Sequence, residues 1–180
     1  MKIAICGTHG TGKTTLAQAL SRKLNLPLIR EVARGVASEG FPVLSRFSTP
    51  TLRTQFAIFG RQLYEEQRHP HFVADRSILD NLAYMRLVIP SDFDQIEMWS
   101  HLVRFARMYA KRTYDVLVYV PIEFKVPSDG FRHTDSKTRE KVDAILRKLL
   151  LGLSFVVVKG TTEERVEEVL KYAADRQRTC

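Results

Sequence analysis

Cysteine and long apolar runs are scarce in this 180-residue sequence. The two cysteines are Cys6, which we expect in a buried strand, and Cys180 at the end of the chain, so they exclude a disulfide framework. No CxxC or HExxH pair occurs, which excludes the familiar zinc motifs. No stretch approaches the roughly 18 consecutive apolar residues that a membrane-spanning helix needs. Because the first strand also leaves no room for a signal peptide, we expect a cytoplasmic protein.

The rest of the composition is typical of a globular protein, with 44% hydrophobic and 27% charged residues. A chain of this length buries roughly 70% of its unfolded surface as one domain. The sequence contains no internal repeat, low-complexity tract or linker. We therefore predict a single domain over residues 1–180.

Positive charge is in excess. The net charge is +8, and residues 1–60 hold eight basic residues against only Glu31 and Glu39. Such an excess raises the local concentration of anionic ligands. It also leaves a nucleic-acid partner open, although each basic side chain taken singly is compatible with an ordinary solvated surface.

A complete GxxxxGK[ST] motif directly follows the apolar run at residues 3–6. This phosphate loop requires a strand before it and a helix after it, and its glycines allow consecutive backbone N–H groups to point at phosphate oxygens. Lys13 is then expected to reach the β- and γ-phosphates of ATP, and the Thr14 hydroxyl to coordinate Mg²⁺. His9 is expected to point away from the phosphates. The residues predicted to bind the nucleotide are Gly7, Thr8, Gly10, Thr11, Gly12, Lys13, Thr14 and Thr15.

Strand and helix patterns alternate along the chain. This order is typical of an α/β protein with a parallel sheet covered by helices on both faces. Near-continuous apolar runs favour buried strands, and apolar residues at helical spacing mark the helices between them. We predict five strands, near residues 3–6, 28–29, 71–75, 116–120 and 155–158.

Charged residues follow two of these strands. Glu31 comes after the second strand, and Asp75 and Arg76 come at the end of the third. Open α/β sheets bind ligands at the carboxyl ends of their strands, where a carboxylate can hold Mg²⁺ or accept a proton and an arginine can neutralise a phosphoryl group. The alternatives are that Asp75 or Ser77 only caps a helix, and that Glu31 forms a surface ion pair with a neighbouring arginine.

A polar, basic segment at about residues 121–140 is predicted to be a lid. It contains two prolines, a glycine and several basic residues, among them Arg132 and Arg139. Phosphoryl transfer gains from exclusion of water and from cations on the γ-phosphate, and a loop of this composition suits that task. A solvated loop without such a role is the alternative.

Several stretches together resemble the small P-loop proteins of the AAA-like ATPase and kinase group related to the ribosylnicotinamide kinase domain, within the nucleoside and nucleotide kinase superfamily. The resemblance covers nearly the whole chain. It implies a three-layer P-loop fold with a five-stranded parallel sheet and a lid after strand four. The stretches that carry it are residues 7–15, 29–34, 72–81, 114–121 and 129–132.

The resemblance also implies roles for individual residues. In deoxynucleoside kinases of this superfamily, a glutamate after strand two takes the proton from the substrate hydroxyl, and an acidic-Arg-Ser trio after strand three supports Mg²⁺ and phosphates. Glu31 and the trio Asp75, Arg76 and Ser77 match these positions. The proton acceptor is therefore Glu31 or Asp75, and Thr14 and Asp75 are the expected metal ligands.

We therefore expect an ATP- and Mg²⁺-dependent kinase that phosphorylates a hydroxyl of a nucleoside, nucleotide or nucleoside-like small molecule. Lys13 and Arg76 would stabilise charge, and Arg132 and Arg139 would close over the phosphates. A kinase acting on nucleic acid and an ATP-dependent regulatory switch are the alternatives. A large AAA+ motor is disfavoured because the chain is short and strand three lacks a paired Asp-Glu ending. A GTPase is disfavoured because no Asn/Thr-Lys-x-Asp stretch follows strand four.

Overall fold

A computed structural model describes residues 1–43, 50–89, 93–123 and 136–178. Within these residues, five strands form one parallel sheet in the order β2-β3-β1-β4-β5. The strands are β1 (Lys2–Cys6), β2 (Leu28–Ile29), β3 (Phe72–Asp75), β4 (Val116–Tyr119) and β5 (Val156–Val157). The predicted five-stranded parallel sheet is thus confirmed, with β3 directly beside β1 and β2 beside β3.

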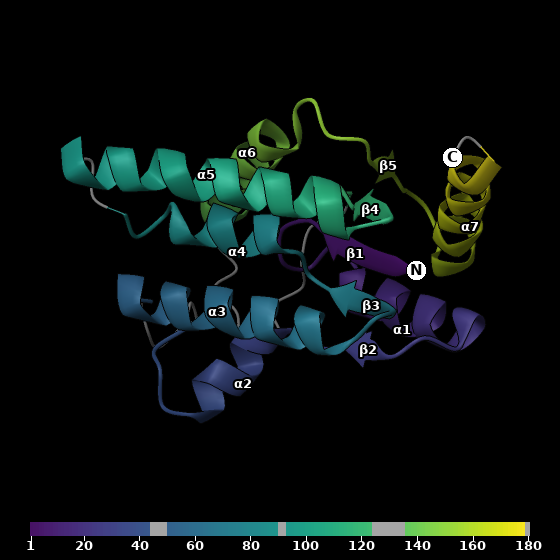
Figure 1. The fold of residues 1–180 in the computed structure, drawn as a ribbon, viewed down its shortest axis with the longest axis horizontal. Helices are drawn as coiled ribbons and strands as arrows, with labels where there is room; N and C mark the ends of the chain where they lie inside the picture. Colours follow the sequence, from purple (N-terminus) through teal and green to yellow (C-terminus); the bar gives the residue numbers. More distant parts are fainter. Residues whose placement is uncertain (44–49, 90–92, 124–135, 179–180) are drawn as a thin grey trace.

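Helices cover both faces of the sheet, as Figure 1 shows. Helices α1 and α7 pack on one face, and α2, α3, α4, α5 and α6 contribute to the core on the other. Three layers result, as expected. The helices are α1 (Lys13–Leu24), α2 (Val32–Ser38), α3 (Leu52–Arg68), α4 (Ile78–Met85), α5 (Phe93–Thr113), α6 (Ser136–Leu150) and α7 (Thr162–Arg178).

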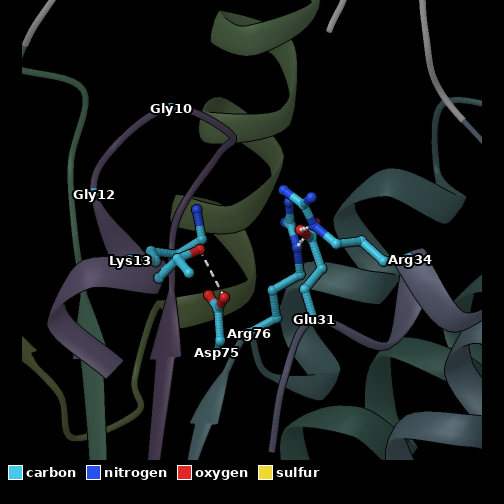
Figure 2. A pocket seen from close by; sticks show the side chains of 8 residues that line it. Gly10, Gly12, Lys13, Glu31, Arg34, Asp75 and Arg76 are labelled. Carbon is cyan, nitrogen blue, oxygen red and sulfur yellow. Dashed lines mark hydrogen bonds and ion pairs between the residues drawn. The ribbon is translucent and has the colours of Figure 1, made fainter. Parts of the chain in front are cut away.

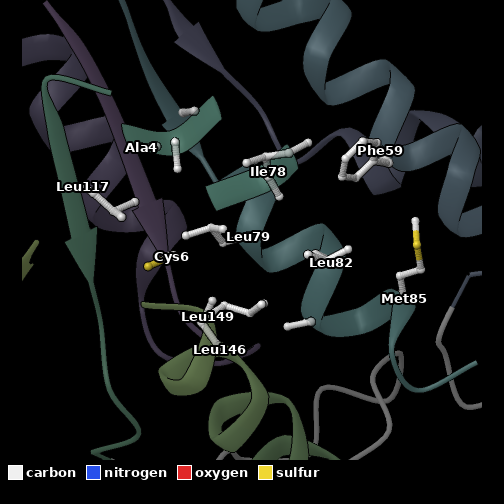
Figure 3. Packing of buried hydrophobic residues seen from close by; sticks show 14 of the residues in the cluster. Ala4, Cys6, Phe59, Ile78, Leu79, Leu82, Met85, Leu117, Leu146 and Leu149 are labelled. Carbon is white, nitrogen blue, oxygen red and sulfur yellow. The ribbon is translucent and has the colours of Figure 1, made fainter. Parts of the chain in front are cut away.

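The central strand β1 is buried on both faces because its side chains alternate between two cores. Ile3 and Ile5 pack with α1 and α7, whereas Ala4 and Cys6 face the larger core. In Figure 3, side chains of α4 fill that larger core between α3 and α6. A strand covered on both faces needs apolar residues at its buried positions, which is why residues 3–6 are all apolar.

Two features differ from the expectations drawn from the sequence. Helix α2 was not anticipated, because a seven-residue segment with Gly35 near its centre has little helical signal. The segment predicted as a lid, about 121–140, overlaps helix α6 from Ser136 onward. Residues 124–135 of that segment lie outside the described residues. No helix among the described residues has both the length and the apolar character needed to span a membrane.

Candidate nucleotide and acceptor site

The phosphate loop joins β1 to α1 at the carboxyl edge of the sheet. Gly7, Gly10 and Gly12 have φ values of 150°, 70° and 87°, which residues with a Cβ rarely adopt. Space is also limiting, since a Cβ on Gly7 would collide with the carbonyl oxygen of Val120. The predicted strand-loop-helix context is therefore present, and the glycines are required by the backbone.

Lys13 lies beneath the loop and is 5% exposed. Its Nζ donates to the carbonyl of Thr8 and to the Thr11 hydroxyl, at 3.3 Å for the latter. Burial, together with the nearby Arg76 guanidinium, lowers the pKa of Lys13 to about 8. An anionic partner would stabilise the charged form of this buried ammonium group.

Asp75 ends β3 directly opposite Ile5 of β1, which brings it beside the first turn of α1. There its Oδ2 accepts a hydrogen bond of 2.7 Å from the Thr14 hydroxyl. Asp75 does not cap α4, so that alternative is wrong: the N-cap is Ser77, whose side chain accepts from Leu79 and Asp80 N–H. A hydroxyl oxygen and a carboxylate oxygen in contact are the kinds of atom that Mg²⁺ takes as ligands from proteins.

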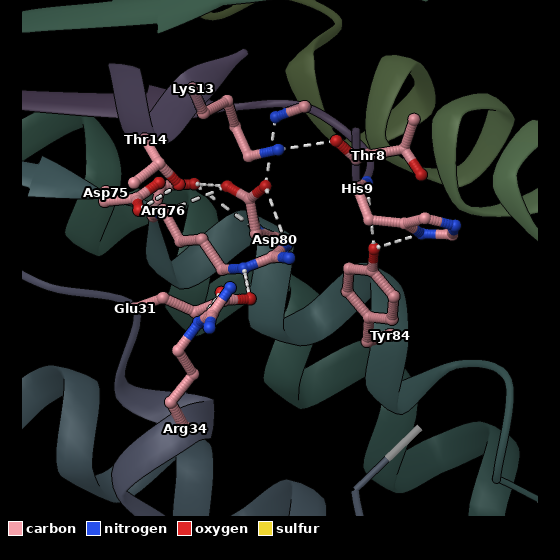
Figure 4. Close-up of polar contacts among 12 residues, drawn as sticks. Thr8, His9, Lys13, Thr14, Glu31, Arg34, Asp75, Arg76, Asp80 and Tyr84 are labelled. Atoms are coloured by element: carbon pink, nitrogen blue, oxygen red, sulfur yellow. Dashed lines mark hydrogen bonds and ion pairs between the residues drawn. The ribbon is translucent and has the colours of Figure 1, made fainter. Parts of the chain in front are cut away.

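Glu31 and Arg76 face each other across the same edge. Arg76 Nε donates to Glu31 Oε1 at 2.7 Å, and Arg34 Nε donates to Oε2 at 3.1 Å (Figure 4). The Arg76 guanidinium, reinforced by that of Arg34, holds the pKa of Glu31 well below its usual range. The expected ion pair with a neighbouring arginine is present, but Glu31 is also joined to a buried arginine from another strand end.

Asp80 is a buried member of the site that the sequence analysis missed. Its Oδ1 accepts from the backbone N–H of Gly7 at 3.0 Å, and its Oδ2 accepts from the N–H and hydroxyl of Ser77. Burial raises the pKa of Asp80, although Arg76 and Lys13 oppose the rise. The sequence signal for Asp80 is the Ser-x-x-Asp spacing of a capping box. This spacing predicts the helix cap but not the hydrogen bond to the phosphate loop.

Tyr84, one turn further along α4, was also missed. Its hydroxyl accepts from the His9 backbone N–H at 3.1 Å and hydrogen-bonds to the His9 imidazole, and its ring lies under the Arg76 guanidinium. Arg139 belongs to α6, not to a loop over the phosphates. It donates from Nε to the carbonyl of His9 at 2.9 Å and from Nη2 to that of Gly10. These contacts hold the outer side of the loop.

Arg165 of α7 is a third residue that was not predicted, and no local pattern marks it. Its Nη1 donates to the carbonyl of Thr11 at 2.8 Å, and its Nη2 pairs with Glu123, which follows β4. A Cβ on Gly12 would come within 2.8 Å of Arg165 Nη1. The phosphate loop is thus fixed from α4, α6 and α7 together.

A cavity of about 260 Å³ lies between the phosphate loop and the charged residues at the strand ends. Figure 2 shows the side chains that line it. One side of it is the phosphate loop and the start of α1, and the other side is formed by the charged residues after β2 and β3. The lining residues are Gly10, Gly12, Lys13, Thr14, Glu31, Arg34, Asp75 and Arg76.

Three predicted site residues remain to be placed. Thr8 is fully buried, with no hydrogen-bond partner for its hydroxyl among the described residues. Thr15 is exposed on α1. Arg132 lies outside the described residues. The described part of the chain contains no cluster of three or more His, Cys, Asp and Glu side chains arranged to hold a metal ion.

Comparisons with solved structures show the same fold at low sequence identity. NadR in complex with NR superimposes with a TM-score of 0.74 and 22% identity over 96% of this chain and 51% of NadR. The chain therefore spans about half the length of NadR. YorR from Bacillus subtilis, in complex with phosphorylated GDP, gives a TM-score of 0.62 and 16% identity, covering 100% of this chain and 99% of YorR.

Deoxyadenosine kinase from M. mycoides, with the products dCMP and dCDP, gives a TM-score of 0.61 and 16% identity, covering 97% of this chain and 99% of the kinase. No curated protein sequence matches the chain. The family model described as "AAA domain" matches residues 2–165, which include the phosphate loop, both charged strand ends and Arg165. The chain belongs to the AAA domain family, in the fold of the small P-loop kinases.

Proposed function

We propose that this protein is a kinase that transfers the γ-phosphate of ATP to a hydroxyl of a nucleoside, nucleotide or nucleoside-like small molecule. The observation that carries the proposal is the shared cavity. The phosphate loop forms the floor of this cavity of about 260 Å³, and the opposite wall is formed by Glu31, Arg34 and Arg76. A switch that only hydrolyses ATP does not need a second charged wall facing the γ-phosphate position. A kinase needs such a wall to hold the acceptor hydroxyl there.

Nucleotide phosphates are bound by the loop and by Lys13. Backbone N–H groups at the start of α1 point along the helix axis toward the loop, and the helix dipole favours an anion there. Lys13 exchanges its hydrogen bond to the Thr8 carbonyl for phosphate oxygens, which compensates its burial better than a neutral carbonyl does. This interaction strengthens as charge develops in transfer, so it lowers the barrier as well as the dissociation constant.

Thr14 and Asp75 are the residues that would hold Mg²⁺. Their oxygens already meet at 2.7 Å beside Lys13. When bound, the ion would neutralise phosphate charge and fix the phosphates in line with the acceptor.

Glu31 is the carboxylate we assign to the acceptor hydroxyl. Its two arginine partners make it a weak base, but phosphoryl transfer through a loose transition state needs positioning more than a strong base. An acceptor hydroxyl donating to Glu31 is held toward the loop, and Arg76 beside it faces the transferred phosphoryl group. Asp75, which already meets the Thr14 hydroxyl, is assigned to the metal and Glu31 to the proton.

The substrate class rests on fold likeness. NadR and deoxyadenosine kinase, which share the fold, are described in complexes with NR and with dCMP and dCDP. The acceptor wall of this chain offers Glu31 for a hydroxyl and Arg34 for a polar or anionic group, which suits a ribose-bearing molecule. None of these likenesses supports a nucleic-acid substrate.

A panel of nucleosides, nucleotides and ribosylated bases, incubated with γ-labelled ATP and Mg²⁺, tests the proposal. We expect label to move to at least one ribose-bearing acceptor, and Lys13→Ala to abolish that transfer. Arg22→Ala, on the exposed last turn of α1, is the matched control and should transfer label at the normal rate. Intact ATP binding with no labelled product from any acceptor would overturn the kinase assignment.

A further inference from the structure

A buried polar cluster lies behind the candidate site, between α3, the end of α5 and the start of α4. Glu66 and Gln62 of α3 are both fully buried, and Tyr114, between α5 and β4, is 6% exposed. Gln62 Nε2 donates to Glu66 Oε1 at 2.7 Å, and the Tyr114 hydroxyl donates to the same carboxylate at 2.9 and 3.0 Å. Among the described residues, no cation is in hydrogen-bond contact with Glu66, and such a carboxylate is costly in a protein core unless its hydrogen bonds compensate for the lost solvation.

A backbone hydrogen bond links the cluster to the site segment. The backbone N–H of Ile78 donates to the Tyr114 hydroxyl oxygen at 3.0 Å. Ile78 is the first residue of α4 and directly follows Asp75, Arg76 and Ser77. Tyr114 therefore donates to Glu66 with its only proton and accepts from the site segment with its oxygen.

The segment 75–77 needs fixed partners because its backbone is strained. Arg76 has a φ of 105°, a conformation that costs on the order of 1–3 kcal/mol for a residue other than glycine. Three consecutive N–H groups are anchored: Arg76 to the Ile5 carbonyl, Ser77 to Asp80 and Ile78 to Tyr114. The strength of the Tyr114 hydroxyl as an acceptor is set by a second buried group, the Glu66 carboxylate.

Glu66 controls how good an acceptor the Tyr114 oxygen is. Ionised Glu66 accepts the tyrosine proton and polarises the hydroxyl, which strengthens the bond from Ile78 N–H. Protonated Glu66 can instead donate to the tyrosine oxygen, in competition with Ile78. Burial raises the pKa of Glu66 to about 7, so both forms are populated near neutral pH.

Other titratable groups among the described residues also act on Glu66. Tyr109 of α5 also hydrogen-bonds to its carboxylate, and Lys2 of β1 acts at longer range. Both tyrosines have raised pKa values because of burial and the neighbouring carboxylate, so neither ionises near neutral pH. Glu66 is therefore the group of this cluster that changes charge there.

We propose that Glu66 and Tyr114 are positioning residues that fix the Asp75–Ser77 segment through the Ile78 backbone N–H and make its geometry depend on the protonation of Glu66. Neither side chain lines the site cavity, so both act through the segment that carries Asp75 and Arg76. The consequence for catalysis rests on the kinase activity proposed above. The link from Glu66 to Ile78 does not.

The test therefore uses two readouts. The first is the Ile78 amide resonance of the whole protein, followed by NMR from pH 5.5 to 8.5 without any substrate. We expect it to titrate with a midpoint near 7 and to lose that titration in Glu66→Gln. The second is kcat for phosphoryl transfer over the same pH range, which we expect to rise with ionisation of Glu66 in the wild type.

Tyr114→Phe and Tyr109→Phe form a matched pair. Both remove a hydroxyl from Glu66, but only the first removes the acceptor of Ile78 N–H. We expect Tyr114→Phe to lower kcat by about tenfold, with little change in the KM for ATP, and to flatten its pH profile in the way that Glu66→Gln does. Tyr109→Phe should keep both the profile and the Ile78 titration, with a shifted midpoint.

The inference would be overturned by an Ile78 amide that titrates identically in wild type and Glu66→Gln, or by equal effects of the two tyrosine variants. If the amide follows Glu66 but no acceptor is ever phosphorylated, the link stands and the proposed kinase activity fails. If transfer is measured but its pH profile is the same in wild type and Glu66→Gln, the kinase stands and the proposed positioning role fails.

Discussion

At the scale of single residues, the two candidate carboxylates differ in their partners. Asp75 is bound by a hydroxyl, whereas Glu31 is bound by two guanidinium groups. A hydroxyl can share a metal ion with a carboxylate, but a guanidinium repels one. The sequence left the proton acceptor open between Glu31 and Asp75, and these partners support the proposed division, with Asp75 toward Mg²⁺ and Glu31 toward the acceptor.

This separation predicts different failures for two conservative variants. Asp75→Asn should lower kcat by roughly 10²-fold or more and raise the Mg²⁺ concentration needed for half-maximal rate, because a metal ligand has lost its charge. Glu31→Gln should lower kcat and raise the KM for the acceptor while the Mg²⁺ requirement stays unchanged. Steady-state kinetics across Mg²⁺ and acceptor concentrations measure both. A raised Mg²⁺ requirement in Glu31→Gln instead would reverse the assignment.

Lys13 predicts a pH dependence of nucleotide binding. Its pKa is lowered to about 8 in the free protein, and phosphate contact favours the protonated form, so binding raises that pKa. Binding should therefore take up a proton near pH 8, and affinity should fall as pH rises from about 7.5 to 9.5. The phosphates of ATP are fully ionised in this range and do not contribute.

Calorimetry in buffers of different ionisation enthalpy measures that proton uptake directly. Lys13→Arg keeps a positive charge at every pH in the range and is the control, because arginine does not deprotonate in proteins. An affinity that is flat between pH 7.5 and 9.5 in the wild type would contradict the lowered pKa.

At the scale of elements, α4 connects the core to the phosphate loop. Its apolar side chains fill the larger core (Figure 3). Its first turn supplies Asp80, which is both the capping-box acid and the acceptor for the Gly7 N–H (Figure 4). The helix N-terminus and the loop thus share one side chain. A change at Asp80 therefore acts on two elements together.

Asp80→Ala should lower the free energy of unfolding by about 2–4 kcal/mol. Loss of the cap accounts for about 1 kcal/mol, and the buried Gly7 N–H left without an acceptor accounts for a further 1–3 kcal/mol. Nucleotide affinity should fall as well, because the loop loses an anchor. Urea unfolding and calorimetry measure the two effects. Ser77→Ala, which leaves the Asp80 bond to Gly7 in place, should lose only about 1 kcal/mol and retain normal affinity.

At the scale of the whole molecule, the buried Glu66 makes stability depend on pH. Its pKa is raised from 4.5 to about 7 in the folded protein, so the folded state binds the proton more tightly than the unfolded state. The contribution of Glu66 to stability is therefore fully present below pH 4.5 and is lost as pH rises through about 7. Asp80 acts in the same direction, because its pKa is also raised.

The difference between wild type and Glu66→Gln isolates this contribution. The free energy of unfolding of the wild type should decline between about pH 5 and 7.5 relative to that of Glu66→Gln, which has no titrating group at this position. Urea unfolding at half-unit pH steps gives the comparison. Parallel curves for the two proteins would show that Glu66 titrates at its ordinary value.

Much of the fold was predictable because its signals are local. The apolar run of β1, the glycine spacing of the loop and the helical periodicity after it each depend on a few consecutive residues. The strand ends carrying Glu31 and Asp75 could be placed near the loop because parallel strands share a carboxyl edge. Helix α2 was not predicted, because a short segment containing Gly35 shows no clear helical periodicity of apolar residues.

The partners of the site residues could not be predicted in the same way. Asp80 binds Gly7 across 73 positions of sequence, Arg76 binds Glu31 across 45, and Arg165 reaches Thr11 across 154. Nothing in the residues between them specifies these pairs. They arise because β3 lies between β1 and β2 and because α7 packs beside α1.

The sequence by itself therefore determined that a phosphate loop exists and which carboxylates stand near it, because torsion angles and periodicity are local properties. The tertiary structure alone decided that Asp75 meets the Thr14 hydroxyl, that Glu31 is held by arginines, and that Glu66 is linked to the Ile78 backbone through Tyr114. Those outcomes depend on strand order and helix packing, which bring together side chains whose charge and solvation no local pattern encodes.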